Sequence, residues 1–323
     1  MKLLITGAGG FVGAAVARAA VEGGHHVVGT VRPGGSRQRL SPIRAQMRVF
    51  ELDLRDSDGV SAMMREEPPD VVIHLAWNGV SNRARFDRLQ ITDNIDASCG
   101  ILDAAVQAGA GRFVGLGSQG EYGALSGKIS ESDLPEPSSL YGAAKLAVLH
   151  LTRQLAAQAG VTFTWLRLFS TYGPGDKPDW LIPSMIEEMM DGSRPRTTLG
   201  TQRWDYLFID DVARGILAAA IEPGVNGIYN LGSGQPVPVR QIVESIRDLV
   251  APEMELVFGE IPYRADQIWH MEADIARLTK ATGWTPRIEL EAGLAKTVAW
   301  HRECRDRGLS GGKLDRDPAA ADA

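Results

Sequence analysis

The sequence reads TGAGGFVG at residues 6–13, directly after a short apolar run at residues 3–5. Three glycines in this stretch follow the spacing G-x-x-G-x-x-G: Gly7, Gly10 and Gly13. Such glycines permit a tight turn after a strand, let the backbone approach a pyrophosphate, and leave the N–H groups of a helix start free for an anion. Val12 departs from the commoner G-x-G-x-x-G spacing, but the physical argument is the same. The stretch therefore predicts a dinucleotide-binding turn, with Phe11 and Val12 also at the ligand.

The next apolar run, at residues 26–28, leads to the segment that distinguishes the two nicotinamide cofactors. An acid after this strand usually holds the 2′-hydroxyl of NAD, whereas a planar arginine suits the 2′-phosphate of NADP. No carboxylate occurs in residues 23–50, and Arg32 stands where the acid would be, with Arg37 and Arg39 close by. We therefore expect NADP(H), with NAD(H) as the alternative if these arginines are only solvated loop residues.

Short apolar runs alternate with amphipathic segments through the first half of the chain. We expect buried strands at residues 3–5, 26–28, 47–50, 71–73, 113–116 and 162–168. We expect helices between them at residues 11–21, 57–65, 94–108 and 141–158. Near-continuous apolar strands that alternate with helices are typical of a parallel sheet covered on both faces. The sequence therefore predicts an α/β fold with a doubly wound parallel sheet of the Rossmann type.

The pattern loosens after residue 175, where prolines interrupt it. A helix at residues 182–190, another that ends at residue 221 and a strand at residues 228–231 follow. We expect a dinucleotide-binding domain formed by residues 1–175 and 206–235. The predicted partner is a smaller, mixed substrate lobe on the C-terminal side, formed by residues 176–205 and 236–309. Residues 310–323 have no apolar face to bury and are predicted to be a disordered tail.

Composition excludes several classes of protein. A formal net charge of −6 argues against sequence-independent binding of nucleic acid, which needs clustered lysines and arginines. The two cysteines, Cys99 and Cys304, are too few for a disulfide framework, and no histidine has a metal-ligand partner at useful spacing. From the first residues we expect no signal peptide, and no apolar run approaches the roughly 18 residues of a spanning helix. We expect a cytoplasmic protein without metal, nucleic acid or membrane partners.

Three residues form a candidate catalytic set. Tyr141 and Lys145 are four residues apart, which on a helix places them on one face. A tyrosine has an ordinary pKa of about 10, and a nearby cation lowers it toward neutral pH, where the phenol can exchange a proton. Ser118 ends a predicted strand, so its hydroxyl lies at the carboxyl edge of the sheet and can bind a carbonyl.

These motifs together resemble the extended short-chain dehydrogenase/reductase family, in its nucleotide-sugar epimerase, dehydratase and ketoreductase branch. The resemblance extends from Thr6 to about Arg302. Its marks are the glycine turn, Asp53-Leu54, His74-Leu75-Ala76, Asn94, Ser118, Tyr141-x-x-x-Lys145, Tyr172-Gly173-Pro174-Gly175, Asp210-Asp211 and Tyr229-Asn230-Leu231-Gly232.

The resemblance implies a role for each of these residues. Tyr141 would donate or accept the proton, Ser118 would polarise the carbonyl, and Lys145 would bind the nicotinamide ribose and tune Tyr141. Cofactor contacts would come from two pairs of residues: Asp53 and Leu54 at the adenine, and Leu75 and Ala76 along the cleft. Asn94 would stabilise the loop behind the site. Relatives often dimerise through the helices that carry Asn94 and Tyr141, so we expect a homodimer.

The resemblance also implies where a nucleotide-sugar substrate binds. Ser170 stands where the family commonly has an asparagine that contacts the diphosphate, and its hydroxyl can still donate. The segment at residues 203–206 resembles an Arg-Asp-aromatic motif with one residue inserted. Arg203 would then reach the diphosphate and Trp204 would pack on the sugar or base. Arg264 is similar to a second diphosphate arginine, and Gln119 completes the predicted substrate contacts.

The residues after Ser118 discriminate between reactions. In the similar 4,6-dehydratases an Asp-Glu pair follows this position, whereas Gln119 and Gly120 can act neither as acid nor as base. Glu121 could enter the site only through a local bulge, so dehydration is disfavoured. We expect an NAD(P)H-dependent reductase of a nucleoside-diphosphate 4-keto-6-deoxy sugar, because Arg32 favours an exchangeable NADPH. The alternatives are a 4-epimerase with retained NAD and a non-catalytic NADP-binding regulatory protein.

Overall fold

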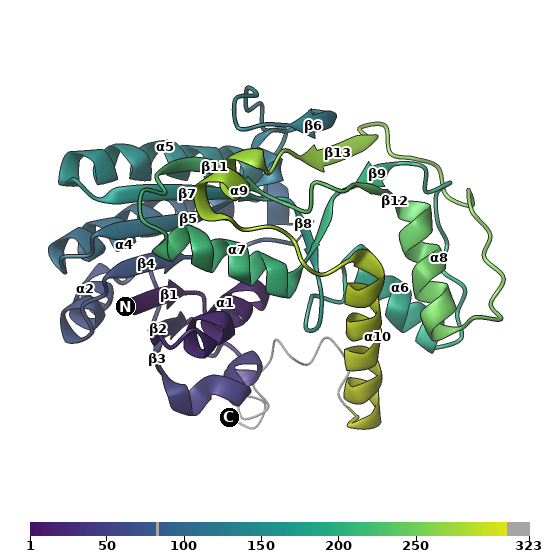
Figure 1. The fold of residues 1–323 in the computed structure, drawn as a ribbon, viewed down its shortest axis with the longest axis horizontal. Coiled ribbons are helices and arrows are strands. Elements are labelled where there is room, and N and C mark those ends of the chain that lie inside the picture. The colour runs from purple at the N-terminus through teal and green to yellow at the C-terminus, as the bar shows by residue number, and fades with distance from the viewer. Residues whose placement is uncertain (82–83, 309–323) are drawn as a thin grey trace.

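A seven-stranded parallel sheet forms the centre of the structure, a computed structural model that describes residues 1–81 and 84–308 (Figure 1). The strands lie in the order β11-β7-β5-β4-β1-β2-β3. Their bounds are β1 Lys2–Thr6, β2 His26–Val31, β3 Met47–Glu51, β4 Val71–His74, β5 Arg112–Ser118, β7 Thr162–Leu168 and β11 Gly227–Leu231. The chain turns from β3 back past β1 to β4, and ligands bind at such a reversal, beyond the carboxyl ends of the strands. The predicted doubly wound α/β fold is confirmed.

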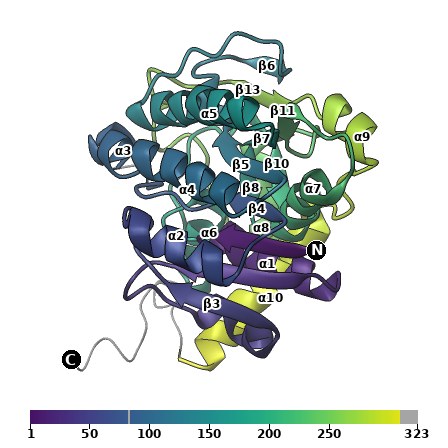
Figure 2. The same ribbon diagram turned by 90° about the vertical axis from the view of Figure 1, so that its left-hand side faces the viewer.

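Helices cover both faces of this sheet. One layer contains α1 (Phe11–Glu22) and α7 (Ile209–Ile221). The other contains α2 (Ser57–Glu66), α4 (Ile95–Gln107) and α5 (Leu140–Ala159), which lie side by side in Figure 2. Strand β1 serves both layers, since Leu3 and Ile5 join the first hydrophobic core while Leu4 joins the second. This alternation is the two-residue period of a strand buried on both faces.

A smaller lobe lies on the right of Figure 1 and combines short strands with helices. Its four-stranded sheet has the order β12-β9-β13-β6, with bounds Val237–Pro238, Arg203–Trp204, His270–Ala273 and Gly127–Ile129. Strand β8 (Ser170–Tyr172) pairs with β10 (Tyr206–Phe208) between the two parts. The helices that pack together here are α6 (Leu181–Met190), α8 (Val239–Val250) and α10 (Leu290–Asp306). Strand β6 comes from within residues 1–175, so this sheet also draws on the first part of the chain.

The remaining elements are short: α3 (Leu89–Thr92), α9 (Ala276–Thr282), and the 3-10 helices η1 (Gln38–Gln46), η2 (Ala84–Phe86) and η3 (Gln119–Glu121). Within residues 1–81 and 84–308, no helix combines the length and the apolar character needed to cross a membrane. The predicted tail at residues 310–323 lies outside the described residues.

Candidate active site

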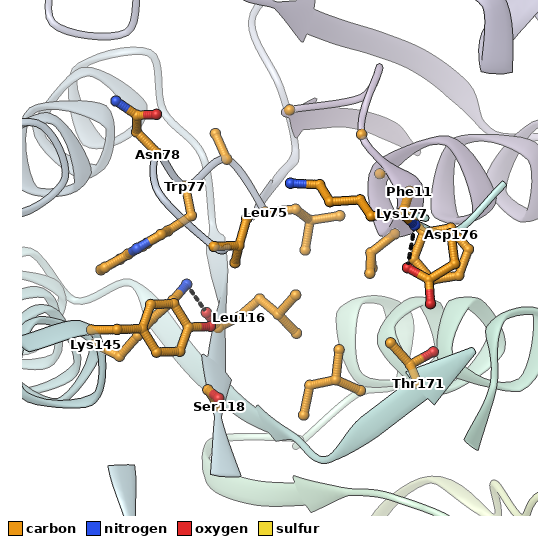
Figure 3. A pocket seen from close by; sticks show the side chains of 18 of the residues that line it. Phe11, Leu75, Trp77, Asn78, Leu116, Ser118, Lys145, Thr171, Asp176 and Lys177 are labelled. Carbon is orange, nitrogen blue, oxygen red and sulfur yellow. Dashed lines mark hydrogen bonds between the residues drawn. The ribbon is translucent and has the colours of Figure 1, made fainter. Parts of the chain in front are cut away.

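A cleft of about 1060 Å³ crosses the carboxyl ends of the central strands and continues to the smaller lobe. Figure 3 shows Ser118 and Lys145 on one side of it, with Phe11, Asp176 and Lys177 on the other. Ligand pockets commonly measure about 300–1,000 Å³. The cleft is therefore large enough for a dinucleotide and a second ligand.

The glycine turn forms one end of this cleft. Gly7 has a φ of +69°, and a Cβ atom there would lie 2.9 Å from the Cα atom of Ala76. A Cβ atom on Gly13 would lie 2.1 Å from the carbonyl oxygen of Gly7, so only glycine lets α1 pack against the turn. Helix α1 has no acid in its first turn, which leaves its N–H groups to attract an anion. This cradle fits a dinucleotide diphosphate.

The arginines after β2 have separate roles. Arg32 is exposed and lines the cleft. Arg37 forms an ion pair with Glu51 and does not line the cleft. Arg39 lines the cleft and donates from Nε and Nη2 to the carbonyl oxygen of Gly175, at 3.1 and 2.8 Å. Of the three arginines that could bind a 2′-phosphate, Arg32 is thus the exposed one that lines the cofactor end of the cleft.

The other predicted cofactor residues also line the cleft: Gly10, Phe11, Val12, Asp53, Leu54, Leu75 and Ala76. Asp53 accepts hydrogen bonds from the side chain and from the backbone N–H of Arg55, and these lower the pKa of Asp53 to about 2. This carboxylate is therefore charged at neutral pH. Asn94 holds the loop after β4, because its Oδ1 accepts from the Asn78 backbone N–H at 2.7 Å.

The structure brings the predicted catalytic residues together. Ser118 ends β5, whereas Tyr141 and Lys145 lie in the first turns of α5, which begins at Leu140. The Lys145 Nζ donates to the carbonyl oxygen of Leu116 at 2.7 Å (Figure 3). The same atom lies 3.6 Å from the centre of the Trp77 ring, within the range of a cation–π contact, and 6.0 Å from the centre of the Tyr141 ring.

Burial governs the charge state of these groups. It raises the pKa of Tyr141, while a hydrogen bond with Ser118 and the charge of Arg85 partly offset the rise. Burial also lowers the pKa of Lys145 to about 7, against the opposing effect of Glu121. In the cofactor-free protein the pKa of Tyr141 is therefore raised rather than lowered, and Lys145 is not among the groups that shift it. Desolvation disfavours both charged forms, and Lys145 interacts with Trp77 and Leu116 instead.

Lys145 should give the free energy of unfolding a pH dependence. Its pKa is about 7 in the folded protein and about 10.4 in an unfolded chain. Between these values the unfolded chain binds more protons, so stability should rise with pH by up to about 1.4 kcal/mol per unit. Urea unfolding from pH 7 to 10 should show a smaller rise for Lys145→Met. The exposed Lys128→Met is the control, and an equal slope in all three proteins would contradict this expectation.

Of the residues that follow Ser118, Gln119 faces the cleft and Glu121 does not. Gln119 lines the cleft, and its Nε2 donates to the Ser170 hydroxyl at 3.3 Å. Glu121 is fully buried, and its Oε1 accepts from the Ser118 backbone N–H at 2.9 Å. Its Oε2 accepts from Arg167 Nε at 2.8 Å. Glu121 is therefore turned away from the cleft and is not among the residues that line it.

Three of the four other predicted substrate residues line the cleft: Ser170, Trp204 and Arg264. Arg264 is also ion-paired with Asp266 at 2.7 Å. Arg203 is the exception, because this side chain does not line the cleft and its Nη2 donates to the carbonyl oxygen of Pro236 at 2.7 Å, so its contact with the diphosphate stays a prediction. Strand β9 carries Arg203 and Trp204 in succession, and neighbouring side chains on a strand point to opposite faces.

Three aromatic or charged residues near the catalytic set were not predicted from the sequence. Trp77 packs edge-on against the Tyr141 ring, with 6.0 Å between ring centres. The Arg85 guanidinium lies 5.4 Å from the centre of the Tyr141 ring and 5.7 Å from the centre of the Trp180 ring. Trp77 follows the predicted Leu75-Ala76 pair, so extending that motif by one residue would have found it. Arg85 and Trp180 lie in segments without a periodic pattern and gave no such signal.

The parallel sheet, the glycine turn and the Ser–Tyr–Lys set define the extended short-chain dehydrogenase/reductase class. Residues 3–232 match the model of the NAD dependent epimerase/dehydratase family, and the chain belongs to this family. The predicted resemblance is therefore confirmed at the level of the family.

The individual relatives do not identify a single reaction. A dTDP-glucose 4,6-dehydratase of Streptomyces griseus is 30% identical and aligns over 94% of each chain. The UDP-glucose 4-epimerase of Thermotoga maritima, solved with UDP-glucose, has a TM-score of 0.85 at 26% identity, over 94% of this chain and 100% of its own. The UDP-glucuronic acid 4-epimerase of Bacillus cereus, solved with NAD, has a TM-score of 0.81 at 25% identity, over 94% and 99%. None of these three is named as a ketoreductase, and the nicotinamide cofactor named for the Bacillus cereus structure is NAD.

Proposed function

We propose that this protein is an NADPH-dependent reductase that acts on C4 of a nucleoside-diphosphate 4-keto-6-deoxy sugar. The observation that carries the proposal is the arrangement after Ser118, where Gln119 faces the cleft and the carboxylate of Glu121 is buried. Elimination of water needs an acid and a base beside the sugar, and this segment supplies neither. The Ser–Tyr–Lys set supports oxidation or reduction at C4 instead.

The charge state of Tyr141 supports the direction of reduction. A phenol whose pKa is raised by burial is protonated at neutral pH and can donate its proton at once. A 4-epimerase starts by removing the proton of the C4 hydroxyl and therefore needs the phenolate first. The cofactor end of the cleft supports the same choice, since Arg32 suits the 2′-phosphate of NADPH.

The protein's contribution is to bind, orient and exchange a proton. When bound, the reduced nicotinamide supplies the hydride. The Ser118 hydroxyl donates a hydrogen bond to the C4 oxygen and polarises the carbonyl, and Tyr141 gives that oxygen its proton. The Lys145 ammonium offers its donors to the nicotinamide ribose, while Gln119, Ser170, Trp204 and Arg264 contact the substrate. Burial of Tyr141 and Lys145 limits the access of water to the reacting atoms.

The test is a mixture of the protein, NADPH and a panel of nucleoside-diphosphate 4-keto-6-deoxy sugars. We expect one equivalent of NADPH to be oxidised for each sugar reduced, measured by absorbance and by mass spectrometry of the product. The relatives favour a second candidate, a 4-epimerase. Tightly bound NAD and interconversion of C4 epimers without net consumption of cofactor would establish that reaction instead.

Arg32 should determine the preference for NADPH. Arg32→Ala removes the guanidinium that would pair with the 2′-phosphate, so the Kd for NADPH should rise about 10- to 100-fold, the range for a charge-assisted hydrogen bond. The Kd for NADH should change little. Arg37→Ala is the matched control, because Arg37 is paired with Glu51 away from the cleft. Fluorescence titration of both cofactors measures the effect, and equal Kd values for NADPH in the wild type and Arg32→Ala would refute it.

A further inference from the structure

Arg85 contacts aromatic residues on both sides of the cleft, Tyr141 on one side and Trp180 on the other. It lies in η2, the short turn after β4. Its guanidinium is 5.4 Å from the centre of the Tyr141 ring on α5 and 5.7 Å from the centre of the Trp180 ring, which precedes α6 of the smaller lobe. Arg85 also lines the cleft, together with both aromatic residues. A cation therefore stands beside the phenol, between the two parts of the protein.

The Nε donor of this arginine is unpaired within the described residues. Its Nε is buried and has no hydrogen-bond partner within the described residues, and no described carboxylate forms an ion pair with it. Buried polar atoms of folded proteins nearly always have a partner, and an exception in a binding cleft points to a missing ligand. The guanidinium offers five donors in a rigid fork and accepts nothing. The ligand group that would complement the Arg85 guanidinium is thus an oxygen acceptor.

The position of Arg85 identifies which oxygen this is. Tyr141 and Ser118 serve the oxygen on C4, so a guanidinium beside the phenol faces the substituents of the neighbouring carbons. In a 6-deoxy sugar, C5 carries a methyl group and the weakly accepting ring oxygen, whereas C3 carries a hydroxyl. We propose that Arg85 is a substrate-binding residue that donates to the oxygen on C3, beside the reacting carbon. This inference rests on the proposed function for its substrate class.

Trp180 supports the Arg85 guanidinium in this subsite. Its ring centre lies 5.7 Å from the Arg85 guanidinium, within the range of a cation–π contact, and this contact helps to hold the fork in place. A planar guanidinium that already contacts two aromatic rings loses little further conformational freedom when it binds an oxygen. Such a site selects strongly, because a substrate that lacks the matching oxygen leaves the buried donor unpaired.

The experiment compares binding of sugars that differ only at C3. The full chain with oxidised cofactor is titrated by calorimetry with dTDP-glucose and dTDP-3-deoxyglucose, and with the corresponding UDP pair. We expect the wild type to prefer the 3-hydroxyl sugar by about 10- to 100-fold, and Arg85→Met to reduce this preference to about 3-fold or less. Arg85→Lys keeps the charge without the fork and should give an intermediate preference. Arg88→Met is the matched control, since Arg88 is exposed and does not line the cleft.

The outcomes separate this inference from the proposed function. An unchanged preference in Arg85→Met, with cofactor binding intact, overturns the role of Arg85 alone. A preference that depends on Arg85, in a protein that oxidises no NADPH with any keto sugar, supports the subsite and overturns the reductase. UDP-glucuronic acid is used as a further probe. If Arg85→Met loses binding only for this sugar, the guanidinium binds a carboxylate on C6, and the assignment to C3 is overturned. Absence of binding to every sugar overturns both.

Discussion

Tyr141→Phe is expected to lower kcat for the 4-keto sugar by about 10²- to 10⁴-fold, the usual contribution of a positioned proton donor. The substitution removes only the phenolic oxygen. The ring remains packed against Trp77 and beneath the Arg85 guanidinium, so the fold and the cofactor cleft should be preserved. The rate is measured under saturating NADPH and sugar, and the Kd for NADPH is measured by fluorescence. The loss should appear in kcat and not in cofactor binding.

A matched control for this variant is Tyr122→Phe. Tyr122 is also fully buried, and its hydroxyl donates to Asn230 Oδ1 at 2.7 Å, but it does not line the cleft. Its loss of a hydroxyl should cost about 1 kcal/mol of stability and leave kcat nearly unchanged. Turnover of Tyr141→Phe at the wild-type rate would remove Tyr141 from the mechanism, whichever sugar is the substrate.

The large sheet could be predicted because its strands are apolar on both faces. Strand β7 has the predicted bounds, residues 162–168, and α4 begins one residue after the predicted start. The sheet of the smaller lobe could not be predicted in the same way. Strand β6 has three residues, and its Gly127 pairs with Met271, which lies far away along the chain. Such a short strand shows no period, and its pairing follows from the packing of the whole chain.

The residues of the candidate site likewise fall into those that local sequence patterns predict and those that only the fold brings together. The glycine turn and the Tyr141–Lys145 pair are local patterns, so their spacing sufficed to predict a shared cleft. Arg85 reaches Tyr141 only through the fold, and no local pattern marks it. The pKa of Tyr141 depends on burial, which a neighbouring lysine in the sequence cannot reveal. The placement of Arg203 outside the cleft could not be predicted for a similar reason, since a motif with one inserted residue says little about the direction of a side chain.

The buried pair of Glu121 and Arg167 should dominate the stability of the loop behind Ser118. The side chains are 0% and 2% exposed, and Glu121 also accepts from Trp165 Nε1 at 3.0 Å. Glu121→Ala leaves a guanidinium buried without its counter-charge and also leaves the N–H groups of Trp165 and Ser118 unpaired. We expect the free energy of unfolding to fall by about 3–5 kcal/mol, measured by urea denaturation. Glu67→Ala, which breaks ion pairs with Lys2 and with the exposed Arg48 at the surface, should cost far less.

A double variant tests whether the unpaired charge is the cause. Arg167 Nη1 has no hydrogen-bond partner among the residues that the structure describes, so even the intact pair is incompletely satisfied. Replacing both partners, in Glu121→Ala/Arg167→Met, removes the buried charge altogether and should recover much of the stability lost in Glu121→Ala. Additive losses in the double variant would contradict this account. A nearly unchanged stability of Glu121→Ala would mean that Glu121 is solvated, and the argument against dehydration, which depends on its burial, would then fail as well.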